Sequence, residues 1–190
     1  MRTLKVLALL LPVVACGPVQ PTASLPPGAV LGATDPMRSA IFGASYAFNN
    51  PGGLASPGVA ARACAQLEYL AANVPQDARY SFTPTLAGQL AAAREELRQA
   101  LGVAPGARPQ EVVDGLYFAS AELDRGNPAN AVGALSPTAF PNPQATLARL
   151  ASLGRLPLSA TATAQAEREH LRLEYERINQ NSIGAGGGRP

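Results

Sequence analysis

The chain has 190 residues, of which 15 are Lys or Arg and 13 are Asp or Glu, and its formal net charge is +2. Arg2 and Lys5 lie within the first five residues, and without them the basic and acidic residues balance. Because this balance leaves no basic field over the rest of the chain, the composition excludes nucleic acid as a partner.

The first sixteen residues are arranged like a bacterial export signal. Arg2 and Lys5 precede an apolar run from Val6 to Val14, and residues 13–16 have the sequence Val-Val-Ala-Cys. This order of charge, apolar length, small residue and cysteine resembles the signal peptide and lipobox of bacterial lipoproteins. A membrane-spanning helix would need ~20 apolar residues, about twice the length of this run, which Pro12 also interrupts.

The resemblance implies that residues 1–15 are a signal peptide and that Cys16 becomes the lipidated first residue of the mature protein. Lipid on Cys16 would attach the protein to a membrane. In the enteric pattern an Asp after this cysteine retains a lipoprotein in the inner membrane. Gly17 therefore implies the outer membrane, with the protein facing the periplasm. An ordinary secretory signal peptide is the alternative.

Cys16 and Cys64 are the two cysteines of the chain. If lipid occupies Cys16, Cys64 has no disulfide partner within the chain. Cys64 follows Ala60, Ala61 and Ala63 in a predicted helix, where a cysteine is typical of a small buried apolar side chain. A bridge from Cys64 to another protein is the alternative.

Two segments flank the predicted domain. Residues 16–34 are rich in Pro, Gly, Ala, Ser and Thr and contain no charged residue, which predicts a flexible tether that begins at the lipidated cysteine. Residues 182–190 are rich in glycine and predict a disordered tail. The helical domain is therefore expected over residues 35–181, which is long enough to enclose one hydrophobic core.

A residue that favours helix N-caps precedes proline at five places, which are Asp35-Pro36, Ser56-Pro57, Thr83-Pro84, Asn127-Pro128 and Asn142-Pro143. Proline suits the first helical position, where its missing N–H would have no partner. Arg108-Pro109 starts another helix, and the last helix is expected to begin near Ser159 or Thr161. No alternating run predicts a strand. The predicted fold class is all-α, a single irregular helical bundle of about five to seven helices.

Apolar residues recur at helical spacing within these segments. The segment that starts at Pro109 has the widest apolar stripe, which predicts that this helix is the most enclosed; the stripe contains Val112, Val113, Leu116, Tyr117, Phe118, Ala119 and Leu123. In the segment that starts at Pro84, four consecutive or nearly consecutive charged residues are expected on the solvent side, namely Arg94, Glu95, Glu96 and Arg98.

Charged residues dominate the last predicted helix, which indicates a mostly solvated surface. Leu171, Tyr175 and Ile178 form a narrow apolar seam in it, at 4-then-3 spacing, which suits contact with a second helix. We expect this seam to dock on the bundle itself. Contact with a partner protein is the alternative.

Glu167-x-x-His170 has a spacing that resembles half of a di-iron carboxylate site, because residues three apart project from one helix face. Such sites need a second Glu-x-x-His, and His170 is the only histidine of the chain. Glu174 could add a ligand, yet the charged neighbours of His170 predict a surface histidine without the supporting contacts that a metal site needs. We therefore expect no metal site and no cofactor.

The sequence contains neither a Gly-x-Ser-x-Gly elbow nor a phosphate-binding loop that ends in Lys, so no catalytic residue is predicted. We interpret the chain as a non-catalytic envelope lipoprotein that binds or scaffolds an envelope protein, with Leu171, Tyr175 and Ile178 as candidate contacts. A small-molecule or lipid carrier is the alternative, with a cavity surrounded by four aromatic residues, Phe42, Tyr69, Tyr117 and Phe118. An enzyme that depends on His170 is the third interpretation.

Overall fold

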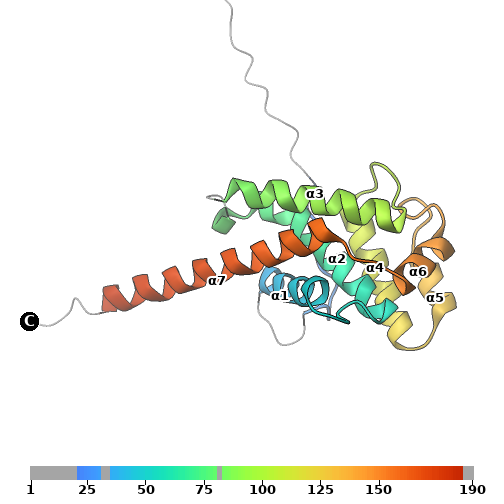
Figure 1. Ribbon diagram of the computed structural model, residues 1–190, viewed down its shortest axis with the longest axis horizontal. Helices are drawn as coiled ribbons and strands as arrows, with labels where there is room; N and C mark the ends of the chain where they lie inside the picture. The colour runs from blue at the N-terminus through green and yellow to red at the C-terminus, as the bar shows by residue number, and fades with distance from the viewer. Residues whose placement is uncertain (1–20, 31–34, 81–82, 186–190) are drawn as a thin grey trace, which may run out of the picture.

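The computed structural model of the protein defines residues 21–30, 35–80 and 83–185, with side chains up to residue 180. These residues form seven α-helices and two short 3-10 helices and contain no strand, which confirms the all-α prediction (Figure 1). The elements are α1 (Pro36–Asn49), α2 (Pro57–Asn73), η1 (Val74–Gln76), η2 (Ala78–Tyr80), α3 (Pro84–Leu101), α4 (Pro109–Asp124), α5 (Pro128–Ala134), α6 (Pro143–Ala151) and α7 (Pro157–Ala185).

Each α-helix in the described residues begins with a proline. Six of these starts are predicted from the sequence, and the seventh, Pro157, lies two residues before the expected start of the last helix. Side-chain caps are less regular: Asp35 accepts from the Met37 N–H and Asn142 from the Ala145 N–H, both at 3.0 Å. No side-chain cap is made by Ser56, Thr83 or Asn127. Proline therefore marks the helix starts more consistently than the capping side chain does.

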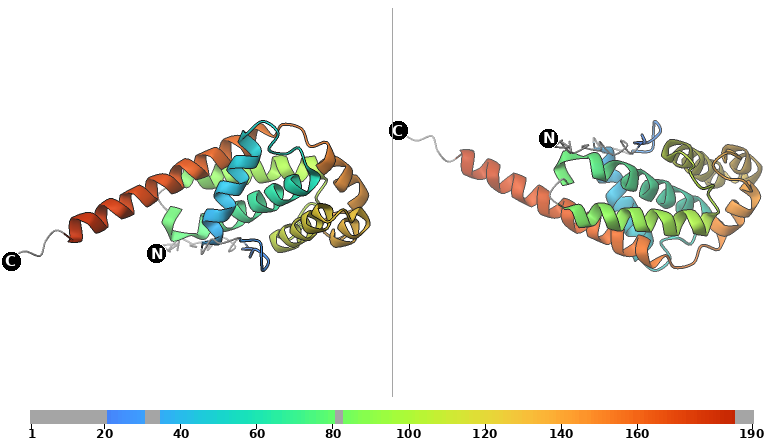
Figure 2. Two further views of the ribbon diagram at one scale, coloured as in Figure 1. Left: turned by 90° about the horizontal axis from the view of Figure 1, so that it is seen from below. Right: turned by 90° about the horizontal axis from the view of Figure 1, so that it is seen from above.

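Helix α2 lies at the centre of the bundle. Helices α1, α3, α4 and α6 pack against it, α5 packs on α4, and α7 lies over α1 and α3 (Figures 1 and 2). Thirteen of the 17 residues of α2 are buried, against eight of the 16 residues of α4. The prediction that the helix from Pro109 is the most enclosed is therefore wrong. Alanine on several sides of α2 lets neighbouring helices approach from all of them, whereas Phe118 of α4 is 54% exposed.

A buried ion-pair cluster joins α2 to α3. The fully buried Glu68 carboxylate accepts hydrogen bonds from Arg98 Nη2 at 2.6 Å and Nε at 3.0 Å, and it lies 2.8 Å from Arg94 Nε. Arg98 Nη2 also donates to the Ala107 carbonyl at 3.0 Å. The expectation that Arg94 and Arg98 face solvent with their acidic neighbours is wrong, since Arg98 is only 8% exposed. The cause is the carboxylate that α2 places opposite both guanidinium groups.

Residues 21–30 belong to the predicted tether, and in the structure they lie against the bundle. Ala23 is buried, and Leu25 and Ala29 pack against the core. Gln110 of α4 binds Ser24 at both ends of its amide: Oε1 accepts from the Ser24 N–H at 2.7 Å, and Nε2 donates to the Ser24 carbonyl at 3.0 Å. This part of the segment is therefore attached to the domain, because its apolar side chains find a surface to cover.

We expect Glu68→Ala to lower the free energy of unfolding by about 3–5 kcal/mol, because the substitution leaves two guanidinium groups without their buried carboxylate. Chemical denaturation followed by far-UV circular dichroism measures the change. Glu176→Ala is the matched control, because Glu176 pairs with Arg172 on an exposed helix surface. A loss for Glu68→Ala no larger than that for the control would contradict a structural role of the cluster.

Candidate functional site

Helix α7, the longest helix in the described residues, is the one that leaves the bundle. Its first half packs over α1 and α3, and its second half extends past the ends of both (Figures 1 and 2). Ala162, Ala166 and His170 are buried on its inner face. Among side chains described beyond position 170, none is fully buried. The second half of α7 is therefore a projecting helix on a packed base.

Polar contacts hold the base of α7 along α1. The Asn49 side chain donates from Nδ2 to Thr163 Oγ1 at 3.1 Å, and the Ser45 hydroxyl donates to the Glu167 carboxylate. Further along, Arg38 forms an ion pair with Glu174. Within the described residues this is the last ion pair between α7 and another helix, so the attached part of α7 ends near Glu174.

The predicted apolar seam faces away from the bundle. Leu171, Tyr175 and Ile178 are 47%, 66% and 55% exposed, so the expectation that they dock on the bundle itself is wrong. His170 and Glu174 occupy the face of α7 that meets α1, and Leu171 and Tyr175 each lie one position further along the helix, a rotation of about 100°. The seam therefore lies on the solvent-exposed surface of α7.

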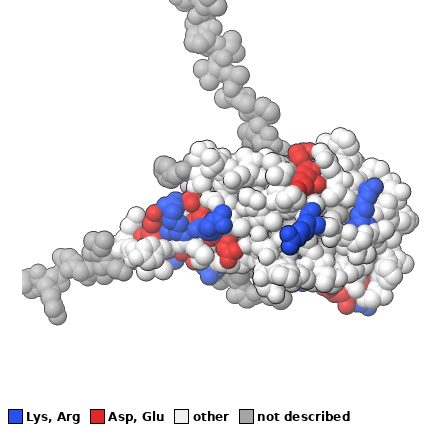
Figure 3. All heavy atoms as spheres, viewed as in Figure 1, with Lys and Arg blue, Asp and Glu red and all other residues white. Residues whose placement is uncertain are grey.

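Charged side chains of both signs surround the seam. On the face shown in Figure 3, blue and red residues gather on the outer half of α7. Arg172 binds Glu169 at 2.6 Å and Glu176 at 2.5 Å, one turn to each side of it along the helix. These pairs favour the helical conformation of the charged part of α7.

His170 is buried, and the prediction of a surface histidine is wrong. Only 4% of it is exposed, because Phe42 of α1 and Tyr80 of η2 cover it. The Tyr80 hydroxyl lies 2.7 Å from Nδ1, and the Phe42 ring meets the imidazole edge-to-face with centroids 5.8 Å apart. Nε2 lies 3.5 Å from the Glu174 carboxylate. The local sequence carries no signal for this burial, since both covering aromatics come from distant segments.

Burial lowers the pKa of His170 below its ordinary value, and nearby Glu174 opposes that shift only in part. Other charges also act on the ring, namely Arg38, Asp35 and Arg79. The imidazole is therefore mostly neutral at pH 7, and its Nδ1 shares a hydrogen bond with the Tyr80 hydroxyl. This arrangement fixes the packing of α7 on α1 and η2.

The members of the Glu167-x-x-His170 pair bind different partners in the structure. Glu167 accepts a hydrogen bond from Ser45, while His170 binds Tyr80. Within residues 21–30, 35–80 and 83–185, no group of three or more His, Cys, Asp or Glu side chains is placed to hold a metal ion. Both members of the pair act in packing α7 against the bundle.

Cys64 is a fully buried free thiol on α2. Burial raises its pKa far above the usual value for cysteine. The buried position confirms the prediction of a small buried apolar side chain. It also argues against a bridge to a partner, because burial disfavours the thiolate needed for exchange.

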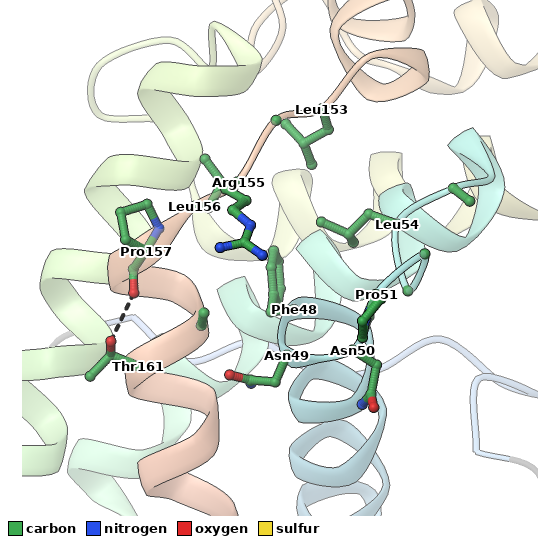
Figure 4. A pocket seen from close by; sticks show the side chains of 16 residues that line it. Phe48, Asn49, Asn50, Pro51, Leu54, Leu153, Arg155, Leu156, Pro157 and Thr161 are labelled. Carbon is green, nitrogen blue, oxygen red and sulfur yellow. Dashed lines mark hydrogen bonds between the residues drawn. The ribbon is translucent and has the colours of Figure 1, made fainter.

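A groove of about 710 Å³ lies between the end of α1 and the start of α7 (Figure 4). One wall is the turn over residues 50–55 that links α1 to α2, and the other is the segment over residues 153–157 that links α6 to α7. Phe48 lies in the groove, and the Arg155 side chain extends toward it (Figure 4). Sequence analysis could not predict this groove, because its two walls are about 100 residues apart in the chain.

The four aromatic residues of the carrier hypothesis do not surround this groove. Tyr69 and Tyr117 are buried, and Phe118 lies on the surface. Phe42 lines a separate, smaller pocket of about 400 Å³, together with Ser45 and Glu167. The prediction of a cavity surrounded by these four residues is therefore wrong, because the four side chains lie in three different environments.

Cys16 and the whole predicted signal peptide lie outside the described residues, so lipidation stays a prediction. Among the helices that the structure does describe, none combines the length and apolar character needed to cross a bilayer. The described chain nearest to Cys16 begins at Pro21 and is docked on the bundle from Ala23.

Comparisons with known proteins do not identify a function for this site. No family model matches the sequence, and no curated protein or solved structure matches it either. The geometry of the described residues therefore carries the functional interpretation.

We expect the stability of the protein to fall as the pH is lowered through the region below 6.5, the ordinary pKa of histidine. The unfolded chain takes up the His170 proton more readily than the folded one, so the stabilisation is complete above that pH and is lost as the folded pKa is passed. Urea midpoints at pH 7.5 and 5.5 measure the loss. In His170→Ala this part of the pH dependence should disappear.

His170→Ala should also lower the free energy of unfolding by about 2–4 kcal/mol at pH 7.5, since the substitution leaves a cavity and an unpaired Tyr80 hydroxyl. Tyr80→Phe is the control that keeps the imidazole and its titration. Equal pH dependence in the native protein and in His170→Ala would show that His170 is not the titrating group.

Native Cys64 should resist alkylation by iodoacetamide at pH 8, because the thiol is both buried and protonated. The same reagent should modify it fully in 6 M guanidinium chloride, as mass spectrometry of the intact protein can measure. The form to use is Cys16→Ser, so that Cys64 is the one thiol present. Complete labelling of the folded protein within minutes would refute the buried position.

Proposed function

We propose that this protein is a membrane-anchored envelope lipoprotein that acts as a non-catalytic interaction or scaffolding module in the periplasm, held at the outer membrane by lipid on Cys16. The observation that carries the interaction is on the outer part of α7, where the large apolar side chains Leu171, Tyr175 and Ile178 are exposed in one row. Large apolar side chains exposed in one row on a projecting element are typical of a contact surface.

The spacing of this row defines the kind of partner. Residues at i, i+4 and i+7 lie on one helix face, so the partner presents a second amphipathic helix or an apolar groove that receives one. Charges of both signs flank the row, with Arg172 and Glu176 beside it. Such a rim favours a protein partner with a mixed polar border around an apolar centre, and it offers no single-sign field to a polyanion.

The proposed anchor places the domain close to the membrane. Ala23 and Ser24 are held on α4, so the chain between Cys16 and Ala23 spans at most about 25 Å when fully extended. This is a shorter reach than a free tether over residues 16–34 would allow. A lipid on Cys16 would therefore restrict the domain to partners in or near the same membrane, which supports an envelope protein as the partner.

The surroundings of His170 support a role in packing rather than in catalysis. It lines neither the groove beside Phe48 nor the smaller pocket beside Phe42. Its Nδ1 is engaged by Tyr80, and its Nε2 is buried. A general base must reach the proton that it removes, so an imidazole enclosed in this way gives no support to the enzyme interpretation.

Photo-crosslinking in intact cells tests the proposal. A photoreactive residue is placed at position 175 in one variant and at position 46 in another, because Tyr175 and Tyr46 are almost equally exposed, at 66% and 67%. We expect one specific adduct from position 175 and none of the same mass from position 46. In addition, Tyr175→Ala should weaken capture of that partner about tenfold or more.

The same experiment in Cys16→Ser tests the anchor. We expect the adduct to disappear when the protein is no longer held at the membrane. Identical adducts from positions 175 and 46 would reject the α7 surface. A specific adduct that persists unchanged in Cys16→Ser would reject the lipid anchor while retaining the interaction.

A further inference from the structure

Arg155 makes no hydrogen bond, ion pair or ring contact with any described group, unlike most of the arginines that the structure describes. Arg38, Arg62, Arg98 and Arg172 each bind a carboxylate, and Arg149 donates to the Leu101 carbonyl. Arg155 instead extends over the groove between α1 and α7, toward Phe48 (Figure 4). The Arg155 guanidinium group carries five N–H donors, and none of them binds a described acceptor at this groove.

The floor of the groove is apolar. Phe48, Leu54, Leu153 and Leu156 pack against the core on one side and line the groove on the other. Its volume of about 710 Å³ lies within the range that is typical of small-molecule sites. An apolar compound in this groove would bury surface that these four side chains now leave partly open to water.

Hydrogen bonds fix both walls of the groove. In the turn after α1, the Gly53 N–H donates to the Asn50 carbonyl and the Ala55 N–H to the Gly52 carbonyl, both at 3.0 Å. Gly52 has a φ of +76°, and a Cβ on Gly53 would lie 2.4 Å from the Ala47 carbonyl oxygen, so both positions need glycine.

The opposite wall is fixed by α3. Glu96 Oε1 accepts from the Leu158 N–H at 3.1 Å, and Oε2 accepts from the Ser159 N–H at 2.8 Å. A carboxylate therefore caps the start of α7. The groove is formed before any ligand arrives, because neither wall depends on one.

The polar side chains that line the groove favour an anionic ligand. Arg155 is the only charged residue among those that line the groove, and no Asp or Glu is among them. The other side-chain donors are engaged: Asn49 Nδ2 binds Ser45 and Thr163, Asn50 Nδ2 binds the Tyr46 carbonyl, and Thr161 Oγ1 binds the Pro157 carbonyl. The unengaged donor of the lining is thus the Arg155 guanidinium, whose planar fork matches a carboxylate.

We propose that this groove binds a small amphipathic carboxylate, with the carboxylate on Arg155 and an alkyl or aryl body on Phe48, Leu54 and Leu156. The site is separate from the projecting half of α7, and it binds its ligand whether or not α7 contacts a partner protein. Binding involves no covalent step. The ligand carboxylate replaces its hydrogen bonds to water with hydrogen bonds to the Arg155 guanidinium, and the apolar part of the ligand is removed from contact with water.

Isothermal titration of the full-length chain with decanoate and with decanol tests this site, because the two compounds share one apolar body and differ in charge. Cys16→Ser is used throughout, so that no acyl chain on the protein competes. We expect decanoate to bind at least about tenfold more tightly than decanol, since the hydrogen bonds to Arg155 are charge-assisted. Backbone amide resonances of Gly52, Gly53 and Leu54 should shift on titration with decanoate.

Arg155→Gln should weaken decanoate binding about tenfold or more and leave decanol binding unchanged. Arg168→Gln is the matched control, an exposed arginine on α7 outside the groove, and it should change neither affinity. Both substituted side chains are exposed, so both variants should retain the native circular dichroism spectrum. Equal affinities for decanoate and decanol, an unchanged decanoate affinity in Arg155→Gln, or no decanoate binding would each overturn the proposal.

Discussion

The rest of the structure depends on the enclosure of α2. Four helices pack on it, and alanine at six of its 13 buried positions lets their backbones come close. Glu68 on this helix is fully buried, and its carboxylate is balanced by Arg94 and Arg98 of α3. A buried charge is tolerated only where its partners are held in place, so this cluster fixes α3 in register against α2. The surface on which α7 lies, formed by α1 and α3, is set as a result.

Helix α7 divides into two parts with different roles. Its base is attached by His170 under Phe42 and Tyr80 and by contacts with α1 that end at Glu174. Beyond Glu174, no ion pair joins its outer part to another described helix, and Arg172 pairs with Glu169 and Glu176 within the turns of α7 itself. A helix that must propagate into solvent gains from a packed base, because nucleation is the costly step of helix formation. The projecting surface is thus held rigidly at one end and open to contact at the other.

The two proposed sites lie at opposite ends of this helix. The start of α7 forms one wall of the groove with Arg155, and the outer half carries the apolar row with Tyr175. Helix α1 takes part in both regions, since its last turn supplies Phe48 to the groove and Arg38 binds Glu174 near the row. Each site can therefore be altered by surface substitutions without changing the buried cluster around Glu68.

The sequence by itself determined the helical class, six of the seven helix starts in the described residues and the buried character of Cys64. These properties depend on local relations: a proline that fits the first helical turn, an apolar period of 3.6 residues, and a cysteine among alanines. Tertiary structure alone decided that α2 lies at the centre, that Arg98 and His170 are buried, and that the row at Tyr175 faces outward. Each of these depends on side chains from segments distant in the chain, such as Glu68 opposite Arg98 or Tyr80 against His170, and helical periodicity cannot show which distant segments will meet.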